Sequence, residues 1–363
     1  MAFDPQTPFD ALPLLPPRAD IETAVILKQC LRATRALAEL KGAGGLIPDQ
    51  SILINSIPLQ EAQASSEIEN ILTTRDALFR AVLDGAKSAD PQTKEVLRYR
   101  TALRMGYEAA RKGGLSHTLL REVCSVLRDE PVDFRKIGEG VCIGNPQTRT
   151  VRYTPPRGGT ALVEKLKNLD DYLLAAEGPD ELIRMAVAHY QFEAIHPFTD
   201  GNGRTGRILN ILYLVHADLL DLPVLYLSGY IIRHKNEYYR LLLEVSTSQA
   251  WEPWILFLLR GIEETARWTA ERVRSIRRLL DEAIERVRRD LPGVYSKELL
   301  EMLFRQPYCK IAFLVDAGIA KRQTAAKYLE ALQNIGLLAG EMVGRERIFV
   351  NTALLELLKD GRP

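Results

Sequence analysis

The stretch "HPFTDGNGRTGR", residues 196–207, places one histidine, one aspartate, three glycines and two arginines within twelve positions. Glycines allow the backbone to approach an anion closely, and the segment that follows has a helical pattern, so its free N–H groups and positive dipole end would face that anion. Arg204 and Arg207 are three residues apart and can reach one polyphosphate through charge-assisted hydrogen bonds. The stretch therefore predicts a phosphate site at a helix N-terminus.

Two further side chains of this stretch suit group transfer to a hydroxyl. His196 lies in the turn before the glycines, and an imidazole with an ordinary pKa of about 6.5 can accept a proton from a hydroxyl that attacks phosphorus. Asp200, at the entrance, could hold Mg²⁺ against the phosphates. The remaining histidines are predicted to be core residues: His117, His189, His216 and His234.

Two other motifs also match part of this stretch, but neighbouring residues exclude both of them. "GNGRTG" matches the dinucleotide fingerprint GxGxxG, but that motif needs a strand before it and repeated βα units, whereas "MAVAHYQFEAI" is helical in character. "DGNG" begins like a calcium loop, but Arg204 and Ile211 stand at the fifth and twelfth positions of that loop. Neither a dinucleotide site nor a calcium loop is predicted.

The composition is that of an ordinary globular protein of 363 residues. Its 48 basic and 47 acidic residues nearly cancel, which excludes a bulk attraction to nucleic acid or to an anionic membrane. Four cysteines without a CxxC spacing argue against a disulfide scaffold or a zinc ribbon. The first residues lack a signal-peptide pattern, and charged residues or proline interrupt the apolar stretches before they reach membrane-spanning length. We expect a cytoplasmic protein with no membrane contact.

Helical periodicity dominates the chain and predicts a mainly α fold. A proline-rich extended arm to about Pro17 comes first, and one interruption, at residues 140–156, shows two short β-prone runs around a Gly-Asn-Pro turn signal and predicts a hairpin. Helices are predicted at 20–42, 56–83, within 91–128, at 161–176, at 181–195 and at 258–291.

Residues 291–363 have the order expected of a winged helix. A helix-turn-helix pattern at 318–338, with Thr324–Leu332 as the second helix, precedes a pair of short strands around Val343 to Arg345. Such a helix can bind DNA, but its exposed positions mix basic and acidic residues. DNA binding and a role in protein contact or dimer formation both stay open.

Residues 196–207 resemble the signature HxFx[DE]GNGRxxR of the Fic (filamentation induced by cAMP) family at every defined position. The segments around residues 16–42, 296–311 and 344–351 look like bacterial Fic proteins with a C-terminal winged helix. The resemblance implies an N-terminal helical region (1–95), a helical Fic core with a β-hairpin flap (96–257), a connecting helix (258–290) and an α+β winged-helix domain (291–363).

The resemblance also implies an activity: transfer of AMP from ATP, with Mg²⁺, to a Ser, Thr or Tyr hydroxyl of a target protein. His196 would be the general base, Asp200 the Mg²⁺ ligand, and Phe198 the buried anchor of the loop. The flap would pair with an extended segment of the target, and a homodimer is expected. The nucleotide contacts would come from Gly201, Asn202, Gly203, Arg204, Arg207, Tyr238 and Tyr239, although aromatic core packing is an equal alternative for the two tyrosines.

A second motif, "SSEIEN" at residues 65–70, places Ser65 and Glu69 four residues apart and so on one helix face. It resembles the inhibitory motif [ST]xxxE[GN] of Fic proteins, on a helix at about residues 60–75. The resemblance implies that Glu69 pairs with Arg207, removes a contact to the γ-phosphate and leaves the resting protein autoinhibited.

Three alternatives to AMP transfer are compatible with the sequence. A Fic enzyme could transfer UMP, phosphocholine or phosphate, or Glu69 could orient a water for removal of AMP from a modified target. The chain could also be a DNA-binding regulator in which the winged helix dominates.

Overall fold

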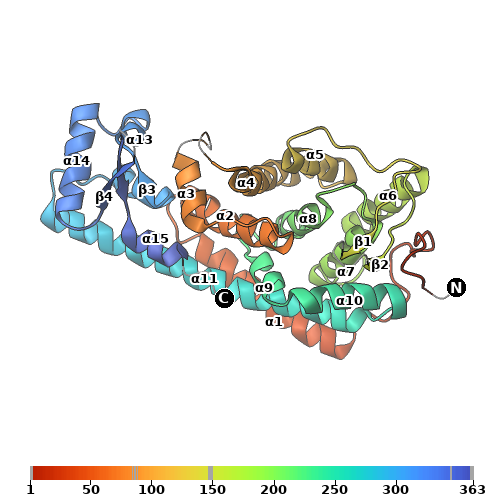
Figure 1. Cartoon of the computed structure of the whole chain (residues 1–363). Helices are drawn as coiled ribbons and strands as arrows, with labels where there is room; N and C mark the ends of the chain where they lie inside the picture. Colours follow the sequence, from red (N-terminus) through yellow and green to blue (C-terminus); the bar gives the residue numbers. More distant parts are fainter. Residues whose placement is uncertain are drawn as a thin grey trace.

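The computed structural model describes residues 3–83, 85, 87, 89–145, 150–343 and 346–359. It is mainly helical, with two small antiparallel sheets, as the sequence predicts (Figure 1). The N-terminal half contains α1 (Ala24–Gly44), α2 (Ser51–Ile68), α3 (Arg75–Leu83), α4 (Pro91–Ala110), α5 (His117–Arg128), β1 (Ile143–Asn145), β2 (Thr150–Tyr153), α6 (Thr160–Leu174) and α7 (Glu181–Ile195).

The C-terminal half begins with the helix that follows the glycine-rich loop. Its elements are α8 (Asn202–His216), α9 (Leu227–Arg233), α10 (Lys235–Ser248), α11 (Trp251–Asp290), α12 (Lys297–Arg305), β3 (Tyr308–Cys309), α13 (Ile311–Asp316), α14 (Arg322–Asn334), β4 (Ala339–Val343), β5 (Glu346–Val350) and α15 (Thr352–Lys359).

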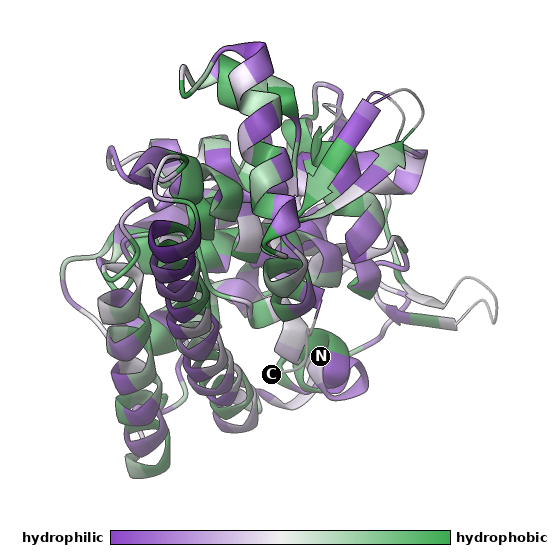
Figure 2. Cartoon of the chain, turned by 90° about the vertical axis from the view of Figure 1, so that its left-hand side faces the viewer, coloured by the Kyte–Doolittle hydropathy of each residue, from purple (hydrophilic) through white to green (hydrophobic). Residues whose placement is uncertain are grey.

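Helices α1 and α11 pack side by side and run beneath the other helices (Figure 1). The charged helix predicted from residue 258 begins earlier, at Trp251, because Trp251 and Trp254 are buried and extend its apolar face toward the Fic-like core. Each helix buries one face: Leu37 and Leu40 of α1 are at most 1% exposed, whereas Leu31 is 54% exposed. Figure 2 shows the resulting mixture of hydrophobic and hydrophilic residues along the helices.

The helical run predicted at 56–83 is two helices, α2 and α3, and α2 begins earlier than predicted, at Ser51. Glu69 is the C-cap of α2, and Asn70 follows in the left-handed region at φ 63°, which ends the helix. Asparagine tolerates this conformation better than most residues. The chain therefore turns away after Glu69, and this carboxylate lies at a helix end, with a side chain 35% exposed.

The predicted hairpin is present as β1 and β2, but its turn is placed differently from the prediction. Gly144 and Asn145, expected in the turn, belong to strand β1, and Pro146–Arg149 lie outside the described residues. A Cβ at Gly144 would collide with the Thr150 carbonyl oxygen, so glycine permits the close approach of the two strands.

The N-terminal arm lies against the base of the hairpin. The Phe9 N–H donates to the Thr154 carbonyl (2.9 Å), and the rings of Phe3 and Phe9 pack against Tyr153. The Tyr153 hydroxyl in turn donates to the Ala194 carbonyl (2.8 Å), close to the end of α7. The arm therefore supports the strand that leads back toward the glycine-rich loop.

The C-terminal elements form the winged helix predicted from the sequence. Their sheet has the order β3-β5-β4, and α14 includes the predicted second helix, residues 324–332, while Gly344 and Arg345 of the predicted turn lie outside the described residues. The domain packs on α2 and α3: Gln60 Nε2 donates to the Leu358 carbonyl (3.0 Å), and Arg80 pairs with Glu341 of β4 (2.9 Å).

Within the described residues, no helix combines the length and the apolar character that a membrane span requires. All four cysteines are free thiols.

We predict that Leu37→Ala lowers the free energy of unfolding by about 2–5 kcal/mol, because it opens a cavity between α1 and α11. Leu31→Ala, on the exposed face of the same helix, should change it by less than about 0.5 kcal/mol. Thermal unfolding of both variants measures the difference. Equal destabilisation by the two variants would contradict the packing described here.

Candidate functional site

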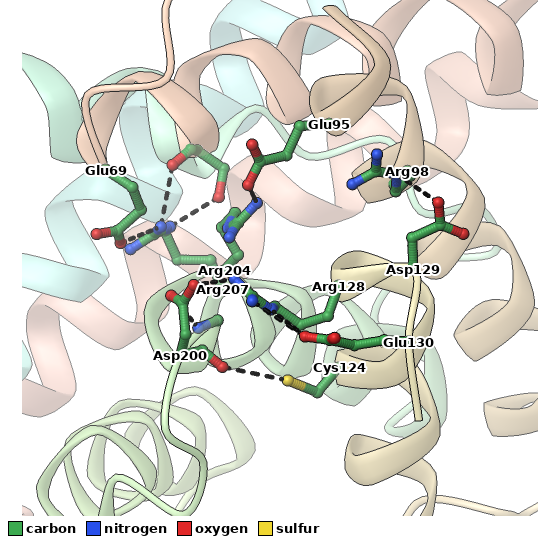
Figure 3. A network of polar contacts seen from close by, with 12 residues as sticks. Glu69, Glu95, Arg98, Cys124, Arg128, Asp129, Glu130, Asp200, Arg204 and Arg207 are labelled. Carbon is green, nitrogen blue, oxygen red and sulfur yellow. Dashed lines mark hydrogen bonds and ion pairs between the residues drawn. The ribbon is translucent and has the colours of Figure 1, made fainter. Parts of the chain in front are cut away.

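The glycine-rich loop joins the C-terminus of α7 to the N-terminus of α8 (Figure 3). His196 caps α7 in the left-handed region at φ 50°, and Gly201 precedes α8 at φ 85° without a side-chain cap. The first N–H groups of a helix have no partner within it, and here they carry the positive end of the dipole. The loop therefore presents the backbone N–H groups of Asn202, Gly203 and Arg204 at this end of α8, whereas the Gly201 N–H donates to Asp200 Oδ1.

The side chain of Asn202 makes hydrogen bonds within the loop, which the motif did not predict. Its Oδ1 accepts from the Phe198 N–H and its Nδ2 donates to the Phe198 carbonyl, both at 2.8 Å. Phe198 is fully buried and stacks on Phe134. The Asn202 amide thus ties the loop together, and only its backbone N–H is available to an anion.

His196 is held by an arginine from outside the motif. The Arg135 guanidinium donates to the carbonyls of His196 (2.8 Å), Ile195 (3.1 Å) and Pro156 (2.8 Å), which joins the loop to the base of the hairpin. Burial, followed by the positive charge of Arg135, lowers the pKa of His196 to about 4. The imidazole is therefore neutral at physiological pH, and Nδ1 is buried, so a substrate would have to meet Nε2.

Arg207 is the most enclosed charged group of the site, with a side chain only 2% exposed. Its Nε donates to Ser65 Oγ (2.8 Å), and its Nη2 donates to the Ser65 carbonyl (3.0 Å) and to Glu69 Oε1 (2.8 Å). Burial opposes the charge, but Glu69 raises the pKa of Arg207, so the guanidinium stays charged. The ion pair between Glu69 and Arg207 that the "SSEIEN" motif predicted is present.

The Glu69 carboxylate also lies directly over the N-terminus of α8. A Cβ at Gly203 would collide with Glu69 Oε1 and would approach Arg207 Nη1 to 3.0 Å. One carboxylate therefore covers the exposed backbone of Gly203 and occupies the guanidinium of Arg207 at the same time. Both are positions that the motif predicts for phosphate contacts.

Arg204 and Asp200 also have partners in this structure (Figure 3). Arg204 Nη1 donates to Glu95 Oε1 on α4 (2.6 Å), and its side chain is 3% exposed. Asp200 forms an ion pair with Arg128 of α5, and its Oδ1 accepts from the Gly201 N–H (2.6 Å). Each of these two charged side chains of the loop therefore has an oppositely charged partner on a neighbouring helix.

The donor set at Asp200 fits a magnesium site that the substrate completes. Within the described ranges, no group of three or more potential metal ligands comes together. Mg²⁺, however, is held in nucleotide sites by one or two carboxylates together with substrate phosphates and waters. Asp200 is 57% exposed beside the phosphate cradle, so it meets that requirement once Arg128 releases it.

The two tyrosines of α10 have different surroundings. Tyr238 is 1% exposed, bonds His189 Nε2 through its hydroxyl (2.9 Å) and packs against Trp254, which favours core packing over nucleotide contact. Tyr239 is partly buried, and the negative charge of Glu69 contributes to the rise of its pKa, second to burial. His189 itself is fully buried, as predicted, whereas His117, His216 and His234, also predicted to be core residues, are only partly buried.

Several residues of the site carry no local signal in the sequence. Arg135, Arg128 and Glu95 stand in unremarkable charged segments, and only the fold brings them to the loop. Glu61 is the exception, because it lies four residues before Ser65 on the same face of α2. Its carboxylate is buried and accepts from the Ser228 N–H (2.9 Å) and the Tyr99 hydroxyl (3.3 Å).

Comparisons with known proteins match three consecutive parts of the chain to family models. Residues 27–108 match the Fic/DOC family N-terminal model, residues 115–214 match the Fic/DOC family model, and residues 279–354 match the model of the C-terminal domain of the SoFic-like protein adenylyltransferases.

Curated relatives carry the name protein adenylyltransferase. The protein adenylyltransferase Fic of Nematostella vectensis is 26% identical over 233 residues, which are 59% of this chain and 51% of the relative. The protein adenylyltransferase fic-1 of Caenorhabditis elegans is 38% identical over 77 residues, 21% of this chain and 15% of the relative. The chain therefore spans about half, or less, of the length of these relatives.

The fold itself has solved counterparts. The crystal structure of a Fic family protein from Desulfovibrio desulfuricans G20 covers 93% of this chain and 98% of its own, with a TM-score of 0.58 and 21% identity. Residues 134–508 of Fic-1 from C. elegans cover 69% of this chain and 73% of their own, with a TM-score of 0.51 and 20% identity. The three family models, in their order along the chain, and this shared fold lead to one conclusion: the chain belongs to the Fic/DOC family.

Proposed function

We propose that this protein is a protein adenylyltransferase that moves AMP from ATP to a hydroxyl of a target protein. The observation that carries the proposal is the convergence, at one helix N-terminus, of free backbone N–H groups, two buried arginines and a neutral histidine. The names of the curated relatives support the same activity.

In the proposed reaction the target hydroxyl oxygen attacks the α-phosphorus of ATP while its proton passes to His196 Nε2. The bond from the α-phosphorus to the oxygen that bridges to the β-phosphate breaks, and pyrophosphate leaves. A pKa of about 4 keeps His196 unprotonated and able to accept that proton. The N–H groups of Gly203 and Arg204 would stabilise the negative charge that develops on the phosphates.

Mg²⁺ held by Asp200 and the phosphates would neutralise charge on the leaving pyrophosphate. This role requires Asp200 to exchange Arg128 for the metal. The freed Arg128 side chain would remain at the rim of the cradle, where it could meet the phosphates.

The resting protein would be inhibited by Glu69. Its carboxylate holds Arg207 and covers Gly203, so the γ-phosphate of ATP could take neither contact. Loss of Glu69 would remove a hydrogen-bonded carboxylate from Arg207 and leave this buried guanidinium with Ser65 and the charge of Glu193, so its attraction for an anion would rise. A γ-phosphate would supply that anion.

The target would dock on the hairpin. The β1–β2 sheet has only two strands, so an extended target segment could add to a free edge by backbone hydrogen bonds. Tyr153 and Pro156 connect this hairpin to the loop of His196, which would align the added hydroxyl with the base.

The first test follows label from α-labelled ATP in a cell lysate. Glu69→Gly should raise protein labelling by about 10²-fold over wild type, because a substrate misplaced by ~1 Å loses roughly that factor. Glu69→Gly combined with His196→Ala should remove the label. Equal labelling by wild type and Glu69→Gly would contradict inhibition by Glu69. If no sample were labelled although ATP still bound, AMP transfer itself would be contradicted.

The second prediction concerns pH. In the Glu69→Gly variant, the acid limb of the kcat/KM profile should lie below about pH 5, whereas an ordinary histidine would place it near pH 6.5. Removal of Glu69 takes away a negative charge that raises the pKa of His196, so the acid limb should move to lower pH.

Glu193→Gln serves as the control, because burial raises the pKa of Glu193 to about 7. If the acid limb vanished in this variant, the limb would belong to Glu193 and not to His196.

The third prediction concerns the metal. Arg128→Gln in the Glu69→Gly background should lower the Mg²⁺ concentration at half-maximal activity, because Asp200 would no longer have a competing partner. Arg121→Gln, an exposed arginine of the same helix, should leave that concentration unchanged. A rise for Arg128→Gln would instead assign this arginine to the phosphates.

A further inference from the structure

A second pocket, of about 130 Å³, lies between α2 and α4. Its apolar wall comes from Ile54, Pro58, Leu103 and Pro223, and its polar side chains are Asn55, Arg100, Thr101, Arg104 and Tyr107. None of its lining residues belongs to the glycine-rich loop or to the Arg207 cluster. A water takes about 30 Å³ of liquid volume, so the space suits a small polyatomic ion.

Arg100 is the unusual group in this pocket. It is partly buried, and across the described part of the chain no acceptor, carboxylate or aromatic ring pairs with its guanidinium. The enclosed arginines of the site differ from it, because Arg135, Arg204 and Arg207 each donate to a carbonyl or a carboxylate. Burial lowers the pKa of Arg100, and the positive charge of Arg104 lowers it further. A lowered pKa is expected for a cation that has no counterion beside it.

The other lining groups strengthen the positive character of the pocket. Arg104 is one helical turn from Arg100 and pairs only at the surface, with Glu108 (3.1 Å), while no acidic residue lines the pocket itself. The Asn55 amide has no hydrogen-bond partner among the described residues and can donate from the opposite wall. Two guanidinium forks and an amide form a donor set for a tetrahedral oxyanion.

We propose that this pocket is a second anion site that binds a phosphate group, separate from the catalytic cradle. The anion would bridge α4 to α2 and would supply the counterion that Arg100 lacks. Because α2 also carries Ser65, the site would lie on the same helix as the inhibitory contact, about two turns before it.

Thermal unfolding with added sodium phosphate at constant ionic strength tests this site. The melting temperature of wild type should rise by about 2–4 °C and saturate. Arg100→Met should melt higher than wild type without phosphate, because a partly buried cation without a counterion is gone, and should show no response to phosphate. Arg98→Gln is the matched control on the same helix, where Arg98 pairs with Asp129, and it should respond as wild type does.

A second variant and two further anions complete the test. Arg104→Gln, at an exposed position, should weaken phosphate binding by about tenfold. Sulfate should act as phosphate does, and citrate should not, since the site suits a tetrahedral oxyanion. A phosphate response that persists in Arg100→Met would place the ion at the catalytic loop and overturn the proposal, as would a response to citrate alone or no response to any anion.

Discussion

The hydrogen-bonded ion pair of Arg207 with α2 is the contact on which the site depends. A guanidinium that is 2% exposed needs acceptors, and here Ser65 accepts from Nε and Nη2 and Glu69 accepts from Nη2. The pair therefore does two things at once: it stabilises a buried charge and it joins α2 to α8. A phosphate is the natural substitute for the Glu69 carboxylate, because it offers the same charge to the same guanidinium and to the same backbone.

Helix α2 is held in place from three directions. Its Glu61 accepts from the N-terminal end of α9 and from Tyr99 of α4, and burial raises the pKa of Glu61 to about 7. Its Gln60 donates to the last turn of α15, so the winged-helix domain contacts the same helix (Figure 1). If the winged-helix domain docked differently, α2 would shift with it, and the Glu69 carboxylate at the end of α2 would shift too.

The geometry of His196 depends on a different set of contacts. Arg135 binds the carbonyls at the end of α7 and the carbonyl of Pro156, while the Asn202 amide closes the loop on Phe198. The N-terminal arm supports the hairpin that continues from Pro156. The glycine-rich loop, the hairpin and the N-terminal arm thus share one hydrogen-bonded framework.

From short, ordered patterns of residues, the sequence alone predicted the helical character, the winged helix and the partner of Arg207. It did not determine where the helical run at 56–83 breaks or where the hairpin turns, since a left-handed Asn70 and a strand-forming Gly144 depend on packing around them. Arg128, Glu95 and Arg135 could not be found either. Their contacts, two ion pairs and one hydrogen bond to a backbone carbonyl, join residues 61 to 109 positions apart and lie outside any local motif, so folding alone brings the partners together.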